Sequence, residues 1–199
     1  MQLKNKHDNF DDYFAHLKKI TFAGRFFKRF IASPILYFQA RRFGHRIIEI
    51  GSGTGSGILG AFPNSVHGLE INPAAVAYCQ ALGMQVQLVK EDGIFPVPDA
   101  TIDVCVLDNV LEHIMDARNT LDECHRVTIK NGGLVIAVPG IRGYASDDDH
   151  KKFYGVDDLR HLDERWKLVS LFSTPFFIKG EYVSKVLKQY CLVATYKKI

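Results

Sequence analysis

A glycine-rich run between an apolar strand and a helix constrains this chain more than any other feature. Residues 46–50 read Arg-Ile-Ile-Glu-Ile, which is typical of a short β-strand, and residues 51–57 read Gly-Ser-Gly-Thr-Gly-Ser-Gly. Because glycine has no Cβ, such a turn lets a ligand lie directly on the main chain. We therefore expect a β-α-β unit with a ligand site at its first turn.

The rest of the chain continues this alternation of strands and helices. Asn72-Pro73 is typical of a helix start, because Asn caps free amides and Pro fits the first turn. The pattern predicts one open, mostly parallel sheet with helices on both faces and a site at the carboxyl ends of its strands. The expected strands are 46–50, 65–70, 84–89, 102–107, 134–138, 167–173 and 189–196, and the expected helices are 72–83, 116–129 and 156–164.

Composition and charge divide the chain into two parts. It has 199 residues, of which 47% are hydrophobic, and this suits one globular domain. Residues 1–46 hold ten Lys or Arg and only three Asp, so we separate a basic arm, residues 1–45, from a sheet domain, residues 46–199. We see no secretory signal and no apolar membrane span, and we expect a cytoplasmic protein.

No motif in the sequence predicts a metal site. The four cysteines lack a C-x-x-C pair, so we interpret them as reduced thiols. Asp147-Asp148-Asp149 offers carboxylates that hard cations prefer. Consecutive side chains point in different directions, so we interpret this run as a solvated loop.

The acid Glu70 restricts the class of ligand that this site can bind. It ends the expected second strand, where a carboxylate can accept both hydroxyl groups of a ribose. The dinucleotide fingerprint G-x-G-x-x-G fails at Ser56, and no phosphate-binding G-x-x-x-x-G-K-[ST] occurs. A ligand with a ribose and an adenine but without phosphate fits better.

Further motifs complete a pattern that resembles the class I S-adenosylmethionine-dependent methyltransferases, most closely the small-molecule group called type 11. The likeness covers residues 46–162. It implies a transferase with a Rossmann-like, doubly wound α/β fold, which uses S-adenosylmethionine to methylate a small-molecule acceptor. To this fold the arm would add an N-terminal helical cap. Its later motifs are Glu91-Asp92-Gly93, Ile102–His113, Lys130–Gly133 and Asp149–Tyr154.

The resemblance also implies which residues hold the cofactor. Gly51, Ser52 and Gly53 would approach its methionine and ribose portions, with Glu49 as a supporting acid that orders the turn. Glu70 would bind the ribose and Ile71 would pack on the adenine. Asp92 and Gly93 would meet the adenine edge. Asp108 and Asn109 would offer backbone groups to the amino acid end of the cofactor.

The residues that face the acceptor are less defined. His113, His150 and Tyr154 follow the fourth and fifth strands and are our candidates, although this chemistry needs a base only when the acceptor must lose a proton. For His113 the alternative is a histidine packed at a helix start. For His150 and Tyr154 it is a loop anchor that closes a lid.

The basic arm has its own alternatives. Residues 22–43 interleave Phe and Tyr with Arg and Lys. We favour a helical cap over the sheet edge or acceptor pocket. Contact with an anionic membrane surface is the second interpretation, and nucleic acid is the third, because no known nucleic-acid module is present.

Two other functions compete with the enzyme. One is a non-catalytic S-adenosylmethionine-binding subunit with a regulatory or scaffolding role, whose pocket would be plugged by the arm. The other is a nicotinamide-dependent oxidoreductase, which Ser56 and the lack of a Tyr-x-x-x-Lys pair disfavour.

Overall fold

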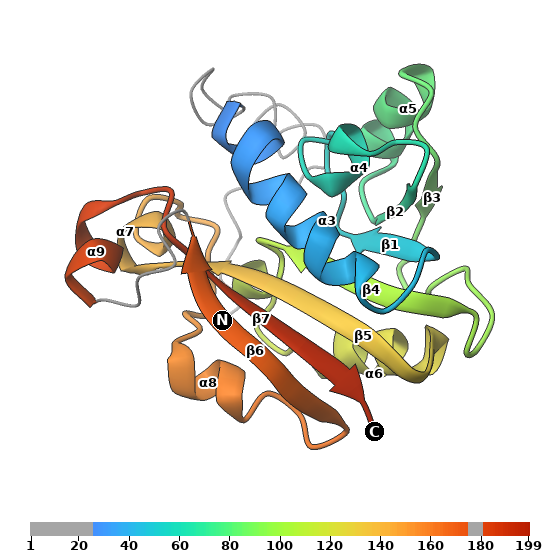
Figure 1. The fold of residues 1–199 in the computed structure, drawn as a ribbon. Coiled ribbons are helices and arrows are strands. Elements are labelled where there is room, and N and C mark those ends of the chain that lie inside the picture. Colours follow the sequence, from blue (N-terminus) through green and yellow to red (C-terminus); the bar gives the residue numbers. More distant parts are fainter. Residues whose placement is uncertain (1–25, 175–180) are drawn as a thin grey trace, which may run out of the picture.

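One seven-stranded sheet organises the computed structural model, which describes residues 26–174 and 181–199 (Figure 1). The strand order is β3-β2-β1-β4-β5-β7-β6. Strands β1 to β5 pair in parallel, and β7 is antiparallel to both β5 and β6. This confirms the mostly parallel, doubly wound sheet. The strands are β1 (Ile47–Ile50), β2 (Val66–Glu70), β3 (Val86–Leu88), β4 (Ile102–Asp108), β5 (Thr128–Pro139), β6 (Trp166–Thr174) and β7 (Cys191–Lys198).

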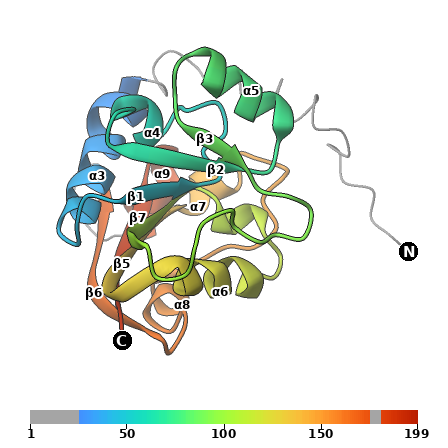
Figure 2. The same ribbon diagram turned by 90° about the vertical axis from the view of Figure 1, so that its right-hand side faces the viewer.

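Helices cover both faces of this sheet (Figure 2). The side chain of Asn72 accepts hydrogen bonds from the amides of Ala74 and Ala75, so the predicted cap of the helix after β2 is present. The helices are η1 (Lys28–Ala32), α3 (Ser33–Arg41), α4 (Ile58–Ala61), α5 (Pro73–Ala81), η2 (Leu111–His113), α6 (Arg118–Val127), α7 (Ile141–Tyr144), α8 (Val156–Arg160) and α9 (Glu181–Val186).

The core has two halves, one on each face of the sheet. Successive side chains of a strand point to opposite faces, so Val104 and Val106 of β4 pack with α3, α4 and α5. Cys105 and Leu107 pack on the other face with α6 and α8. The apolar character of β4 on both faces follows from this double burial.

The fifth strand begins earlier than the sequence pattern predicts. We expected a helix to residue 129 and a strand from residue 134, but α6 ends at Val127 and β5 begins at Thr128. Thr128 pairs with Ile102 across a register shift in β4. The ammonium of Lys198 also donates to the carbonyl oxygens of His125 and Thr128, at 2.6 and 2.7 Å. These tertiary contacts, which local spacing does not encode, end the helix.

The N-terminal arm packs against the sheet through one face of α3. Leu36 and Ala40 are buried against the half-core that contains β4 and β5, whereas Phe26, Phe30 and Phe38 are exposed. Residues 22–25 of the predicted basic and aromatic segment lie outside the described residues. No helix within the described ranges has the length and apolar character needed to cross a membrane.

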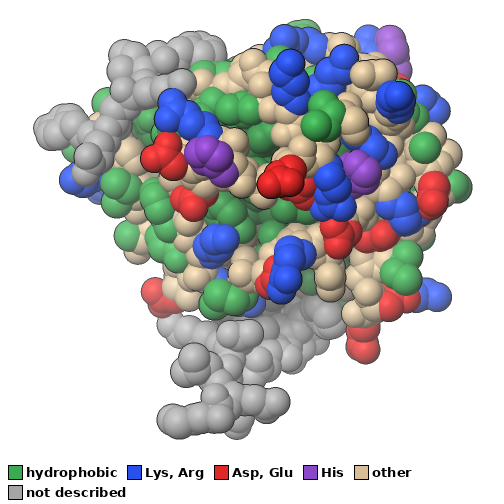
Figure 3. All heavy atoms as spheres, turned by 90° about the horizontal axis from the view of Figure 1, so that it is seen from below, with side chains coloured by type: hydrophobic (Ala, Val, Ile, Leu, Met, Phe, Trp, Pro, Cys, Tyr) green, Lys and Arg blue, Asp and Glu red, His purple; other side chains and the backbone are tan. Residues whose placement is uncertain are grey.

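Charged side chains on the face seen from below are mixed in sign (Figure 3). Lys and Arg alternate there with Asp and Glu, and the purple histidines lie among them. This face therefore presents no broad patch of one charge.

Candidate functional site

The glycine turn after β1 is held by the neighbouring strand β2. The amides of Gly51 and Ser52 donate to the carbonyl oxygen of Leu69, at 2.8 and 3.2 Å. The amide of Gly53 donates to the carboxylate of Glu70 at 2.7 Å. Gly51, Gly53 and Gly55 have positive φ, the backbone region that glycine adopts without strain. The turn is therefore a fixed structure whose shape depends on β2.

Glu49 binds the other side of the turn. It is 2% exposed, and its carboxylate accepts hydrogen bonds from the amides of Ile58 and Leu59 where α4 begins. Burial, with the nearby charge of Asp108, raises the pKa of Glu49 to about 7. This position is that of an acid that supports the turn, as the resemblance implied, and the side chain also borders the cavity described below.

Glu70 lies beside the turn, where the sequence placed it. It is 4% exposed and also accepts hydrogen bonds from the amides of Ile71 and Asn72, both at 2.9 Å. Burial raises its pKa, which the three backbone donors partly offset. A carboxylate has about four lone-pair positions, so three bound amides leave room for one more donor.

The predicted adenine residues lie at the ends of β2 and β3. Ile71 is 59% exposed although it is a large apolar side chain directly after a buried strand. Asp92 is exposed and accepts a hydrogen bond from the amide of Ile94, which is a local turn of the kind that Asp forms in loops. Gly93 has a positive φ and open space where a side chain would be.

A cavity of about 510 Å³ opens at the carboxyl ends of β1, β4 and β5. Gly51, Ser52 and Gly53 form one wall. The opposite walls come from the segments after β4 and β5, and the arm contributes Lys28 and Leu36. Glu70, Ile71, Asp92 and Gly93 are outside its lining. The structure thus divides the predicted cofactor residues into one group that lines the cavity and one group outside it. The hydrogen bond from Gly53 to Glu70 connects the two groups.

The end of β4 supplies an acid and a strained residue to the cavity. Asp108 is 6% exposed and forms an ion pair with Lys28 at 3.3 Å. Asn109 has a φ of 55°, which is uncommon for a residue other than glycine, and its side-chain amide donates to Asp108. The backbone N–H of Asn109 donates to the carbonyl oxygen of Ala137, so that group is not available to a ligand.

Two of the three acceptor-facing candidates reach the cavity. His113 and His150 both border it, and their ring centroids are 4.6 Å apart. Burial, with the charge of His150, lowers the pKa of His113. Tyr154 does not border the cavity: it is 3% exposed within the core cluster that contains α6 and α8. The structure therefore places Tyr154 in the core, whereas its neighbour Phe153 is exposed.

Two residues at the cavity lay outside the sequence prediction. Glu112 belongs to the quoted motif after β4, but its role was not assigned, and it is fully buried beside His150. Lys28 lies in the arm, which sequence reasoning treated as a cap without naming a residue that enters the site. An acid and a histidine adjacent at a strand end were the available signal for Glu112.

The site fits the cofactor that the resemblance implies. A zwitterionic amino acid group finds both a cation and an anion in Lys28 and Asp108, on the side of the Gly51 turn. A side chain at Gly51 would collide with Val110, which keeps the turn bare. The exposed apolar surface of Ile71, next to Glu70, suits an aromatic base.

Comparisons with known proteins agree with this geometry. The sequence model of a family described as methyltransferase domain matches residues 48–136. A probable S-adenosylmethionine-dependent methyltransferase of Mycolicibacterium smegmatis is 31% identical over 99 residues, which are 48% of this chain and 38% of that protein. The chain spans less than half the length of the curated relatives it matches, reaching 46% for those of Mycobacterium tuberculosis.

Solved structures share the fold over nearly the whole chain. A chain from the Haloferax volcanii complex of the Trm112 methyltransferase activator with a methyltransferase superposes with a TM-score of 0.73, at 16% identity, over 98% of this chain and 99% of that one. A SAM dependent methyltransferase from Archaeoglobus fulgidus gives 0.68, at 18% identity, over 94% and 99%. Together, these comparisons show a match to a methyltransferase domain at residues 48–136 and, over nearly the whole chain, the fold of S-adenosylmethionine-dependent methyltransferases.

Proposed function

We propose that this chain transfers the methyl group of S-adenosylmethionine to a small-molecule acceptor. The observation that carries the proposal is that the glycine turn and a polar wall face the same cavity of about 510 Å³. The turn offers bare backbone on one side. Glu112, His113 and His150 offer polar groups on the other.

The cofactor supplies an electrophilic methyl group on a sulfonium with a good neutral leaving group. Lys28 would bind its carboxylate and Asp108 its ammonium, because these two side chains already form an ion pair at the turn. Glu70 would accept a hydrogen bond from the ribose, and Ile71 would cover one face of the adenine. The chain's main contribution is then to align the reactants and to exclude water.

The arm supports a small acceptor. Phe27, Lys28, Ala32 and Leu36 border the cavity, so an acceptor must fit a volume typical of small-molecule sites. These contacts support the proposal that the arm caps the pocket. The same side chains leave the cavity open rather than filling it, which favours turnover over the alternative of a non-catalytic binding subunit.

Calorimetry tests the cofactor half of the proposal. We expect S-adenosylmethionine and S-adenosylhomocysteine to bind with measurable heat and to raise the melting temperature, whereas reduced nicotinamide dinucleotide does neither. Absence of binding by both ligands in folded protein would end the proposal.

Methyl labelling tests the acceptor half. The protein is incubated with methyl-tritiated S-adenosylmethionine and cell extract, separated by size into small-molecule and macromolecular fractions. We expect transfer into the small-molecule fraction. Label confined to macromolecules would refute the small acceptor, and cofactor binding without label in either fraction would favour the non-catalytic subunit.

A further inference from the structure

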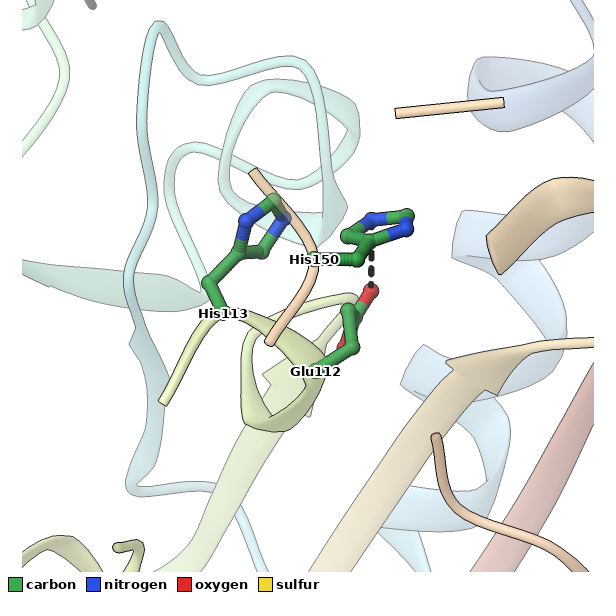
Figure 4. A group of neighbouring side chains, drawn as sticks. All are labelled: Glu112, His113 and His150. Atoms are coloured by element: carbon green, nitrogen blue, oxygen red, sulfur yellow. Dashed lines mark ion pairs between the residues drawn. The ribbon is translucent and has the colours of Figure 1, made fainter. Parts of the chain in front are cut away.

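Three side chains that commonly bind metals meet at the wall of the cavity. Glu112 and His113 belong to η2, and His150 comes from the loop that follows α7 (Figure 4). One ligand atom from each lies within 4.8 Å of the others. In Figure 4 the Glu112 carboxylate points to the ring of His150, and His113 lies beside that ring.

The carboxylate of Glu112 lacks the partners that a buried acid needs. Glu112 is 0% exposed, and neither of its oxygens has a hydrogen-bond partner among the described residues. Its nearest oxygen lies 3.9 Å from Nε2 of His150. A buried carboxylate of this kind is normally paired or bound to a metal.

The histidine rings are held in the orientation that metal ligands adopt. Nδ1 of His150 lies 2.7 Å from the carbonyl oxygen of Tyr144. Because a carbonyl oxygen only accepts, Nδ1 carries the proton, and the lone pair of the neutral ring is at Nε2, on the side of Glu112. The ring of His113 packs edge-on against the ring of His150, with the centroids 4.6 Å apart.

The main chain keeps the three side chains together. The amides of Lys151 and Lys152 donate to the carbonyl oxygen of Glu112, at 2.7 and 3.1 Å. These bonds fix the loop that carries His150 on η2. The cluster is therefore built by the backbone, and its ligand atoms need no large rearrangement to converge.

We propose that Glu112, His113 and His150 bind one divalent transition-metal ion, of which Zn²⁺ is the representative, with its open positions toward the cavity. Two imidazoles and one carboxylate favour such ions over Mg²⁺, which prefers oxygen ligands. Ligand bonds of about 2.1 Å hold ligand atoms at most about 4.2 Å apart, so the ion draws the cluster slightly inward. Sequence reasoning had expected no metal site.

The ion would face the place where the acceptor lies in the proposed function, and this part of the inference rests on that function. A bound metal would polarise an acceptor oxygen and lower its pKa, so a hydroxyl acceptor would release its proton to solvent water before its oxygen attacks the methyl group. Metal binding itself does not depend on the methyltransferase proposal.

Titration with Co²⁺ and Zn²⁺ tests the site directly. The full chain is stripped with a chelator and dialysed. Co²⁺ is then followed by its visible absorption, and Zn²⁺ by calorimetry. We expect one equivalent of each ion and an affinity for Mg²⁺ at least a hundredfold weaker than for Zn²⁺. Absence of Co²⁺ absorption and Zn²⁺ heat in folded protein would overturn the site, and so would equal affinity for Mg²⁺.

Three ligand variants and one matched control locate the ion. Glu112→Gln, His113→Asn and His150→Asn should each weaken Zn²⁺ at least tenfold and change the Co²⁺ spectrum. His161→Asn is the control, because Nδ1 of His161 also lies against a backbone carbonyl oxygen, 3.0 Å away, but outside the cluster. Circular dichroism verifies that each variant is folded. One folded ligand variant is enough to test whether the cluster binds the ion. Wild-type affinity in the folded ligand variants would refute the assignment.

S-adenosylhomocysteine binding by the wild type separates this inference from the proposed function. Zn²⁺ binding without cofactor binding would keep the metal site and refute the methyltransferase. Cofactor binding without Zn²⁺ binding would refute the metal site and leave the proposed function in place.

Discussion

The Nζ atom of Lys28 lies 3.3 Å from Oδ2 of Asp108, and this ion pair joins the N-terminal arm to the end of β4 at the cavity. Burial alone would lower the pKa of Lys28. The carboxylates of Asp108 and Glu49 outweigh burial and raise it, so the ammonium stays charged. The arm therefore brings a fixed positive charge to the bare glycine turn.

Replacement of this charge should weaken cofactor binding. In Lys28→Met, Asp108 loses its ion-pair partner, and the cofactor's carboxylate loses its cation. We expect the affinity for S-adenosylhomocysteine to fall at least tenfold, about 1.4 kcal/mol, in calorimetry. Lys90→Met, at an exposed position, is the matched control and should bind as the wild type does. Equal affinity in both variants would remove Lys28 from the site.

Glu70→Gln should weaken cofactor binding. It retains one oxygen for the amides of Ile71 and Asn72, sets an NH₂ group in place of the oxygen that accepts from Gly53, and loses the charge that strengthens a bond from a ribose hydroxyl. We expect a loss of roughly 2 kcal/mol, about thirtyfold, in S-adenosylhomocysteine binding by calorimetry. Glu91→Gln, on the surface, controls for the change in net charge. Unaltered binding in Glu70→Gln would leave this acid with only a turn-supporting role.

Alanine variants of two glycines with similar φ values distinguish backbone strain from the loss of cofactor contact. Gly51 has a φ of 67° and Gly83 a φ of 79°, so alanine at either site costs about 1 kcal/mol or more of folding stability. An added Cβ at Gly51 would meet Val110 at 2.8 Å, whereas Gly83 has open space. We expect both variants to melt at lower temperature but only Gly51→Ala to lose cofactor affinity. Loss of affinity in Gly83→Ala as well would point to general destabilisation.

The sequence predicted the parts of the site that depend on the pairing of strands that follow one another in the chain. The glycine turn and Glu70 are close because β1 and β2 pair in register, and a strand-turn-helix pattern implies that pairing. Contacts between distant segments were not predictable in this way. His150 reaches Glu112 only because the loop after α7 folds back and donates two amides to the carbonyl oxygen of Glu112. Likewise, Tyr154 lies in the core because the path of that loop, rather than its composition, decides which side chains face the cavity.

The exposed aromatic side chains of the arm give the membrane interpretation a direct test. Phe26, Phe30 and Phe38 are 53%, 61% and 66% exposed, and Arg42 is exposed on the same arm. If the arm contacts an anionic membrane, the protein should co-sediment with phosphatidylserine-rich vesicles at low salt and dissociate as salt screens the attraction. Phe30→Ser with Phe38→Ser should abolish sedimentation. Leu82→Ser, an exposed apolar side chain on α5's C-cap, should not. Failure to sediment at low salt would leave the arm as a cap alone.

Glu49 should make stability depend on pH in the neutral range. Its folded pKa of about 7 exceeds the ordinary value of 4.5 because the acid is buried, so the folded state keeps a proton that the unfolded chain has released. The stabilisation is complete below pH 4.5, decreases as pH rises toward 7, and is absent above it. The difference between the two pKa values corresponds to roughly 3 kcal/mol.

Urea unfolding followed by circular dichroism at pH 5, 6, 7 and 8 measures this dependence. Other groups also titrate, so the informative quantity is the difference in slope between wild type and Glu49→Gln, whose neutral amide cannot titrate. We expect the variant to lose less stability than the wild type between pH 5 and 7, while Glu91→Gln follows the wild type. Identical slopes in all three proteins would show that Glu49 has an ordinary pKa, and that burial between the turn and α4 does not hold its proton.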